Sequence, residues 1–153
     1  MVAVRNMQDL RPYQHLAVDH ILATKRCALW VFMGGGKTVS TLTALMLLDL
    51  LEGDAFPVLV IAPLRVASST WPAEVEKWAH LSHLTVSAIL GSEAERRAAA
   101  RAKAHLYTVN YENLPWLIEE LGADWPFATV VVDESTKLKG FRGSIQRLSL
   151  IHI

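Results

Sequence analysis

The sequence predicts an α/β fold in which helices cover both faces of a parallel sheet. Short apolar strands alternate with longer helical segments along a chain of 153 residues. Two runs within these strands, at 58–62 (VLVIA) and 130–132 (VVV), are apolar at every position, which is typical of strands buried on both faces. The length fits one domain, because domains commonly contain roughly 100–200 residues.

Each element follows from a local signal. Runs of apolar and β-branched residues predict five strands, at 27–32, 58–62, 84–90, 106–109 and 129–132. Helical signals predict five helices, at 11–24, 37–51, 66–79, 92–103 and 112–121. The helix over 92–103 has the strongest signals: Ser92 is suited to cap it, Glu95 follows three residues later, and Glu93 and Arg97 form an i,i+4 pair.

Composition excludes several classes of protein. Lys and Arg total 15, as do Asp and Glu, so the chain lacks the overall positive charge of many nucleic-acid-binding proteins. The single cysteine, Cys27, cannot form an internal disulfide, and it excludes a cysteine-rich metal site. Neither a signal-peptide core nor a membrane span of about 20 apolar residues is present. We therefore expect a soluble protein of the cytoplasm, with no membrane partner.

A glycine-rich turn joins the first predicted strand to the helix over 37–51. Its sequence at 34–38 is GGGKT, and such a turn lets backbone N–H groups surround phosphate oxygens at a helix N-terminus. Lys37 supplies a positive charge for the β- and γ-phosphates, and Thr38 supplies a hydroxyl for Mg²⁺. The strict phosphate-binding pattern requires glycine at position 31, where this chain has Val31. By itself, the turn is also compatible with a purely structural role.

Two carboxylates follow the apolar strand at 129–132. Asp133 is placed to bind Mg²⁺ through water, and Glu134 to deprotonate the attacking water. Paired acids at a strand end are common on their own. In a parallel sheet, however, ligands bind beyond the carboxyl ends of the strands, where both the glycine turn and this acid pair are expected. Together they predict a nucleoside triphosphatase site.

The order of these motifs resembles the first RecA-like lobe of superfamily 2 helicases, and within it the Swi/Snf-related DEAD/DEAH-box ATPases of phages and bacteria. The similar segments are 10–14 (LRPYQ, Q motif), 34–38 (GGGKT, motif I), 61–65 (IAPLR, motif Ia), 107–112 (YTVNYE, motif Ib) and 133–137 (DESTK, motif II). Motif I of this superfamily lacks the first glycine, so Val31 is compatible with it.

The resemblance implies a P-loop ATPase lobe that moves on DNA at the expense of ATP. Gln14 would recognise adenine, Gly34, Gly35, Gly36, Lys37 and Thr38 would bind the phosphates, Thr38 and Asp133 would bind Mg²⁺, and Glu134 would be the general base, with Lys37 also catalytic. Arg65 and Asn110 would contact nucleic acid, which we expect to be double-stranded DNA bound with little sequence preference.

The chain departs from the family pattern at two places. Phe32 stands where the family often has an acid, and Ser135 and Thr136 replace the usual end of motif II. Motif III and the second lobe, which supplies an arginine finger in the family, are absent from the sequence. Because an arginine finger contributes about 10³–10⁵ in rate, we expect this chain alone to bind ATP weakly and to hydrolyse it very slowly.

The domain prediction is an incomplete first lobe at 1–147, followed by a tail at 148–153. The tail, LSLIHI, resembles one reading frame of a transposase adapter end used in sequencing libraries. We therefore expect the tail not to be native and the reading frame to be truncated. A natural stop codon after Ile153 in the gene would contradict this.

Two other functions are compatible with the phosphate-binding motif. One is a P-loop phosphotransferase of another class, which would act independently of nucleic acid. The other is a non-catalytic module that binds a nucleotide or a protein partner, which would bind ATP without turnover even with the missing lobe present.

Overall fold

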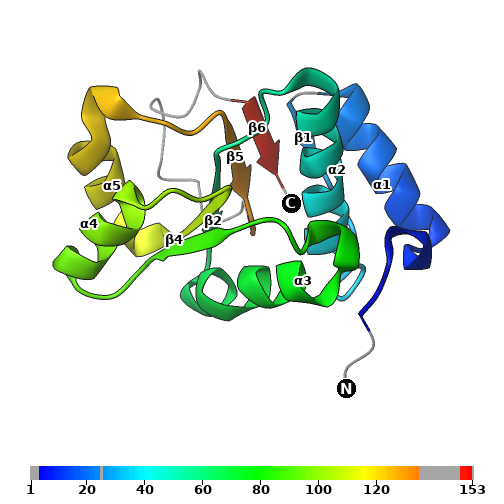
Figure 1. The fold of residues 1–153 in the computed structure, drawn as a ribbon, viewed down its shortest axis with the longest axis horizontal. Helices are drawn as coiled ribbons and strands as arrows, with labels where there is room; N and C mark the ends of the chain where they lie inside the picture. Colours follow the sequence, from blue (N-terminus) through cyan, green and yellow to red (C-terminus); the bar gives the residue numbers. More distant parts are fainter. Residues whose placement is uncertain (1–3, 25, 135–148, 153) are drawn as a thin grey trace.

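The computed structural model describes residues 4–24, 26–134 and 149–152, and in the last segment the backbone alone. Its sheet has six strands in the order β1-β6-β5-β2-β4-β3, and every pair is parallel (Figure 1). The strands are β1 (Cys27–Ala28), β2 (Val58–Ala62), β3 (Val86–Ile89), β4 (Leu106–Asn110), β5 (Thr129–Val132) and β6 (Ser149–His152).

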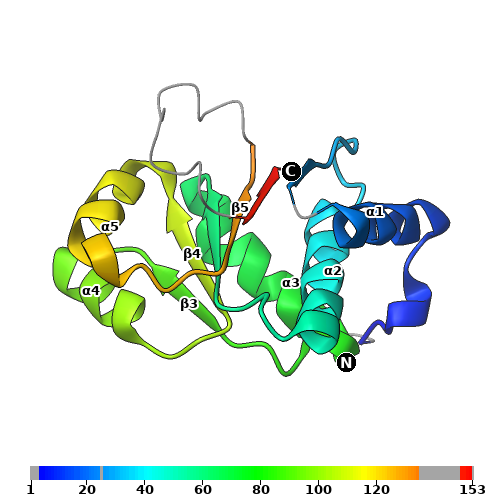
Figure 2. The ribbon, with the colours of Figure 1, turned by 90° about the horizontal axis from the view of Figure 1, so that it is seen from above.

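Helices cover both faces of this sheet, as the sequence predicts. The α-helices are α1 (Pro12–Ala23), α2 (Lys37–Glu52), α3 (Trp71–Lys77), α4 (Glu93–Arg101) and α5 (Leu114–Leu121). Figure 2 shows α4 and α5 on one side of the strands, and α1 and α2 on the other. No helix among the described residues is both long and apolar enough to cross a membrane.

The two faces are visible within the single strand β2. Val58, Val60 and Ala62 belong to a core cluster with residues of α1, α2 and α3. Leu59 and Ile61 alternate with them and belong to a second cluster with residues of α4 and α5. Because successive strand residues point to opposite faces, a run that is apolar at every position is what a two-sided core requires. The predicted fold class is confirmed.

The segment before the glycine turn differs from the prediction. The strand expected at 27–32 extends over Cys27–Ala28 alone. Trp30 is 84% exposed and Phe32 is 66% exposed. β1 lies at the edge of the sheet, where it pairs with β6 on one side only. Ala28 is aligned with His152, the last described residue of β6, so the described ladder ends there.

Two predicted helices are interrupted at their N-terminal ends. The one expected at 66–79 begins as a π-helical turn, Val66–Thr70, and α3 ends at Lys77. The one expected at 112–121 begins as a 3₁₀ turn, Tyr111–Asn113, before α5. The π turn is the more unusual feature, because such turns are rare and are frequent at functional sites.

The tail contributes a strand that the sequence did not predict. β6 pairs in parallel with β1 on one side and with β5 on the other, with Ile151 aligned to both Cys27 and Val131. Backbone pairing of this kind depends little on side-chain identity, so it does not test whether the tail is native. The prediction for 148–153 stays a prediction, and Leu148 and Ile153 lie outside the described residues.

Candidate nucleotide-binding site

The glycine turn has the backbone geometry that only glycine adopts readily. Gly34 and Gly36 both have φ of +76°, in the left-handed region. Gly36 is the N-cap of α2, so the turn leads directly into a helix N-terminus. At that end, helix N–H groups without partners in the helix attract anions such as phosphate.

Neighbouring side chains close the space around two of these glycines. A Cβ at Gly35 would lie 2.3 Å from Cγ1 of Val31, and one at Gly36 would lie 2.0 Å from Nε2 of Gln14. Both distances are far below van der Waals contact. Val31, which departs from the strict phosphate-binding pattern, therefore packs against the turn and leaves room only for glycine at 35.

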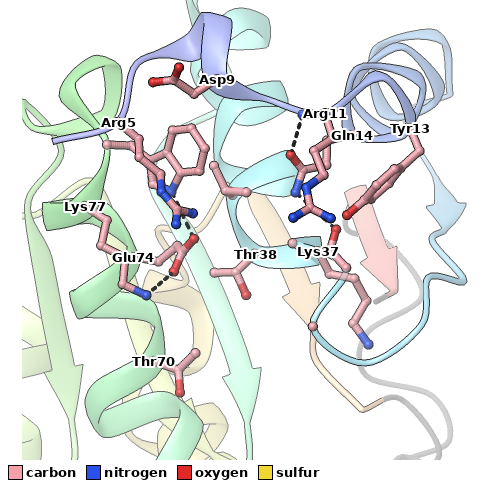
Figure 3. Close-up of a pocket in the computed structure, with 15 residues that line it drawn as sticks. Arg5, Asp9, Arg11, Tyr13, Gln14, Lys37, Thr38, Thr70, Glu74 and Lys77 are labelled. Atoms are coloured by element: carbon pink, nitrogen blue, oxygen red, sulfur yellow. Dashed lines mark hydrogen bonds and ion pairs between the residues drawn. The ribbon is translucent and has the colours of Figure 1, made fainter. Parts of the chain in front are cut away.

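Gln14 joins α1 to the glycine turn. Its Nε2 donates to the carbonyl oxygen of Gly35 at 3.2 Å, and its Oε1 accepts from the backbone N–H of Arg11 at 2.8 Å (Figure 3). The side chain is buried. A carboxamide has two N–H groups and two acceptor lone pairs, so one of each is left for another partner. One free N–H donor and one free acceptor are suited to the edge of an adenine base. This role of Gln14 stays a prediction.

The turn forms one wall of a cavity of about 420 Å³. Such a volume falls in the range of small-molecule sites, about 300–1,000 Å³. Figure 3 shows Lys37 and Thr38 at the start of α2, with Glu74 and Lys77 of α3 opposite them. The lining residues are Arg5, Asp9, Arg11, Tyr13, Gln14, Gly34, Gly35, Gly36, Lys37, Thr38, Val39, Thr70, Glu74, Lys77 and Trp78.

Asp133 lies directly after β5, and its side chain is 9% exposed. Its Oδ2 accepts a hydrogen bond of 3.2 Å from Nε1 of Trp71. Burial raises the pKa of Asp133 above its ordinary value, while the bond from Trp71 and the positive charge of Lys37 act in the opposite direction. The charge of Lys37 thus acts on Asp133, although Asp133 and Glu134 do not line the cavity beside the glycine turn, and their shared site stays a prediction.

The backbone at the acid pair is unusual. Glu134 has φ of +58° and is the one non-glycine residue with positive φ among those described. The hydroxyl of Tyr111 donates to the carbonyl oxygen of Asp133, and the carbonyl oxygen of Glu134 lies 3.2 Å from the same hydroxyl. Such conformations cost about 1–3 kcal/mol and are concentrated at functional sites. Tyr111 thus ties the turn after β5 to the segment after β4.

The residues present fit Mg²⁺ bound together with a nucleotide. No cluster of three or more His, Cys, Asp or Glu capable of binding a metal occurs in the described part of the chain. Mg²⁺ commonly binds through one or two carboxylates, waters and substrate phosphates, so it does not need such a cluster. The hydroxyl of Thr38 and the carboxylate of Asp133 are hard oxygen ligands of the required kind.

The residues predicted to contact nucleic acid differ in exposure. Arg65 is exposed, immediately before the π-helical turn. Asn110 is 7% exposed, and its Nδ2 donates to Glu112. Both roles stay predictions, but only Arg65 has an accessible side chain. Ser135 and Thr136, at the end of the predicted motif II, lie outside the described residues.

Sequence reasoning missed Trp71 and Tyr111. Each bonds to the acid pair from a distant segment, 62 and 22 residues away from Asp133 in sequence. Tryptophan is usually a packing residue, and nothing in the local sequence around Trp71 indicates an acidic partner. Trp71 follows the predicted motif Ia and Tyr111 lies within the predicted motif Ib, but neither position indicates a bond to the acid pair.

Comparison with protein families settles the identity of the domain. The family model of the SNF2-related domain matches residues 17–150. The chain belongs to the SNF2-related domain family. The family predicted from the order of the motifs is therefore confirmed.

Individual relatives agree with this family. Protein p41 of Acyrthosiphon pisum secondary endosymbiont phage 1 is 53% identical over 133 residues, which cover 86% of this chain and 29% of that protein. Chromodomain-helicase-DNA-binding protein 7 of Gallus gallus is 31% identical, over 88% of this chain and 5% of its own length. Transcription regulatory protein SNF2 of Saccharomyces cerevisiae is 30% identical, over 74% of this chain and 7% of its own length. The chain thus spans less than a third of these relatives.

Solved structures share the fold. The Sulfolobus solfataricus SWI2/SNF2 ATPase core in complex with double-stranded DNA superposes with a TM-score of 0.74 at 24% identity, covering 95% of this chain and 31% of that one. The type ISP restriction-modification enzyme LlaGI, solved with a DNA substrate mimic, gives a TM-score of 0.64 at 17% identity. That match covers 95% of this chain and 17% of the LlaGI chain. At these identities the similarity shows the fold.

Proposed function

We propose that this chain is the ATP-binding lobe of a motor that moves on DNA by hydrolysing Mg·ATP. The observation that carries the proposal is that Lys37, at the start of α2 after β1, and the buried Asp133, directly after β5, both follow the carboxyl ends of strands in one parallel sheet. Two motifs far apart in sequence thus supply both the phosphate-binding and the metal-binding groups of one site.

Each residue has a distinct task in this proposal. Lys37 and the N–H groups of 34–36 bind the phosphates, and Gln14 recognises adenine beside them. Thr38 and Asp133 hold Mg²⁺, which when bound neutralises charge on the phosphates. Glu134, exposed at the turn after β5, orients the attacking water and accepts its proton.

Double-stranded DNA is the proposed partner. The name of one relative, the double-stranded DNA in one solved structure and the DNA substrate mimic in the other support this choice. The exposed guanidinium of Arg65 is suited to a phosphate contact, which positions a protein on DNA without reading its sequence. The phage relative supports the cytoplasm of a bacterium or of a phage-infected cell as the location.

In this proposal, full turnover requires a second lobe that supplies an arginine finger.

We also propose that residues 148–153 are not part of the native lobe. Sequencing across the genomic locus tests this proposal about the tail. Native coding sequence that differs from LSLIHI after residue 147 is expected, whereas a natural stop codon after Ile153 contradicts it.

Thermal unfolding with and without Mg·ATP tests the nucleotide site. We expect Mg·ATP to raise the Tm of the wild-type chain and to leave the Tm of Lys37→Ala unchanged. Stabilisation equals RT ln(1 + [L]/Kd), so a saturating ligand at 100 times Kd contributes about 2.7 kcal/mol. Lys103→Ala is the matched control, because Lys103 is an exposed lysine beyond the end of α4 and away from the cavity.

The outcomes separate this proposal from its alternatives. An equal rise for Lys37→Ala and wild type would contradict the phosphate-binding role of Lys37. In a protein that includes the second lobe, hydrolysis stimulated by DNA supports the motor. Phosphate transfer to a small acceptor without DNA would instead identify a phosphotransferase, and binding without turnover a non-catalytic module.

A further inference from the structure

Trp71 is the first residue of α3 and is completely buried. Its indole N–H donates to Oδ2 of Asp133 at 3.2 Å, in a hydrogen bond that is itself buried. Tryptophan can only donate, and an ionised carboxylate can only accept, so the bond has one possible direction. A buried bond to a charged group is stronger than a neutral one and fixes the orientation of its acceptor.

The structure also fixes Trp71. The π-helical turn Val66–Thr70 precedes it, and the carbonyl oxygen of Ala67 within that turn accepts a 2.8 Å bond from Oγ1 of Thr108 on β4. Ala67 and Thr108 are both fully buried. The indole therefore starts from a segment anchored to the sheet, as a group that orients another must.

The carboxylate keeps acceptor capacity on top of this bond. Two carboxylate oxygens offer about four lone-pair sites. Trp71 uses one of them. The remaining capacity is available to waters of a bound ion, in an orientation that the indole sets.

We infer that Trp71 is a positioning residue, whose indole N–H holds the carboxylate of Asp133 in the orientation that receives Mg²⁺ with the nucleotide. This inference rests on the proposed function, because it assumes that Asp133 takes part in binding Mg²⁺. Trp71 touches neither the nucleotide nor the metal in this role. Partners that orient metal ligands typically change metal affinity about 10–100-fold when they are removed.

Calorimetric titration of ATP into the 153-residue chain, once with Mg²⁺ and once with EDTA, isolates this effect. The ratio of the two Kd values defines the Mg²⁺ gain. For Trp71→Phe we expect the Kd in EDTA to match that of the wild type and the Mg²⁺ gain to fall about tenfold. A merely structural loss would weaken binding in both conditions alike.

Trp125→Phe is the matched control. The indole Nε1 of Trp125 is buried and has no hydrogen-bond partner among the described residues. The same substitution there removes an indole that does not orient a carboxylate, so the Mg²⁺ gain should equal that of the wild type.

A second variant keeps the test valid if Trp71→Phe does not fold. Benzothienylalanine at position 71 preserves the shape of the indole and replaces its N–H with sulfur, and it should also lower the Mg²⁺ gain about tenfold. An unchanged gain in this variant would overturn the inference while leaving the proposed function intact.

The wild-type titration distinguishes a failure of the inference about Trp71 from a failure of the proposed function. ATP binding with no Mg²⁺ gain would overturn the inference and the role of Asp133, but not the phosphate-binding turn. No ATP binding in either condition would contradict the proposed function itself, and with it the inference.

Discussion

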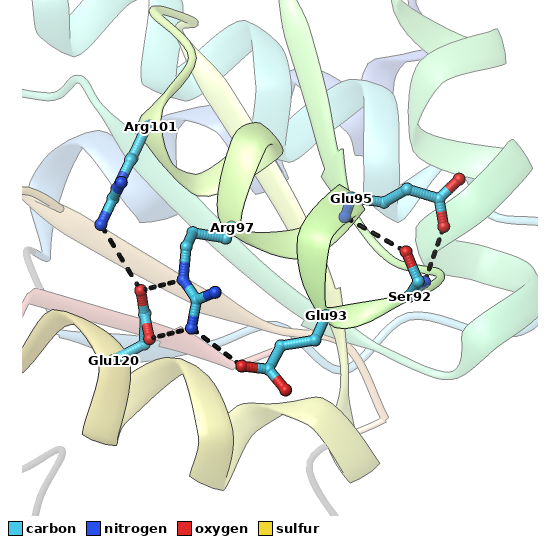
Figure 4. Close-up of polar contacts among 6 residues, drawn as sticks. All are labelled: Ser92, Glu93, Glu95, Arg97, Arg101 and Glu120. Carbon is cyan, nitrogen blue, oxygen red and sulfur yellow. Dashed lines mark hydrogen bonds and ion pairs between the residues drawn. The ribbon is translucent and has the colours of Figure 1, made fainter.

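The nucleotide end of the sheet and the outer pair of helices α4 and α5 are built by different rules. In α4, Ser92 accepts from the backbone N–H of Glu95, and Glu95 accepts from that of Ser92, a complete capping box. The guanidinium of Arg97 bonds to Glu93 one turn earlier and to Glu120 of α5 (Figure 4). The contacts within 92–97 are exposed and connect residues three or four positions apart, whereas the bond to Glu120 is part-buried and joins the two helices.

The nucleotide end depends instead on contacts between distant segments. Gln14 bonds to Gly35, and Trp71 bonds to Asp133. Its local geometry is also unfavourable, with a buried carboxylate and positive φ at Glu134. A protein tolerates such local costs where they serve a function, so the contrast itself points to the nucleotide end as the site.

The largest effect is expected from Gly36→Ala at the N-terminus of α2. The new Cβ would combine strain at φ of +76° with a steric clash, because it would lie only 2.0 Å from Nε2 of Gln14. We expect the free energy of unfolding to fall by about 2–4 kcal/mol and ATP binding to be lost. Urea unfolding and calorimetry measure the two effects.

Gly53→Ala, at the other end of the same helix, is the matched comparison. Gly53 has φ of +74°, with nothing within 4 Å of its ideal Cβ. Strain alone should cost about 1–2 kcal/mol, and ATP affinity should not change. Equal losses of stability and of ATP binding in both variants would show that packing against Gln14 does not matter.

Asp133→Asn should stabilise the fold and remove the Mg²⁺ gain. Burial raises the pKa of Asp133, so its ionised form destabilises the folded state at neutral pH. As the pH falls through that raised pKa, the folded wild type takes up a proton, and the difference in stability between variant and wild type shrinks. Without nucleotide, we expect the Tm of the variant at pH 7 to be higher by about 2–4 °C, for about 1 kcal/mol. A lower Tm for the variant would argue against a cost of burying this carboxylate.

Ser92→Ala tests the outer region. Loss of the N-cap should cost about 1 kcal/mol, with no change in ATP affinity. The bonds from Ser92 lower the pKa of Glu95 below its ordinary value of 4.5. The stabilisation by Glu95 is therefore present above about pH 4.5 and is lost as the pH falls through the lowered pKa. Chemical unfolding at several pH values measures both effects, and a loss of ATP binding would break the separation of the two regions.

The smallest effect is expected from Arg101→Ala. Its guanidinium lies 3.7 Å from Glu120, and the side chain is 73% exposed. Exposed pairs of this kind contribute little, so the free energy of unfolding should change by less than about 0.5 kcal/mol. A change above about 1 kcal/mol in urea unfolding would mean that the ion pairs of α4 and α5 act as a stabilising network.

The same contrast explains what could be predicted from the sequence. The bounds of β2 and β5 and the capping box at Ser92 follow from local patterns, and the structure has them as predicted. The glycine turn and the acid pair can be singled out because their residue types carry the chemistry, and their roles stay predictions. The short β1, the π-helical turn and the bond from Trp71 to Asp133 depend on tertiary partners, which a local pattern does not contain.

Amide NMR of the chain labelled with ¹⁵N-glycine tests the central claim most directly. The eight glycines include the turn at 34–36 as well as Gly53, Gly91 and Gly122 elsewhere in the fold. On addition of Mg·ATP, we expect large shifts for Gly34, Gly35 and Gly36, and none for those other three. Unchanged signals in the turn, or equal shifts at Gly91 and Gly122, would contradict a nucleotide site at this end of the sheet.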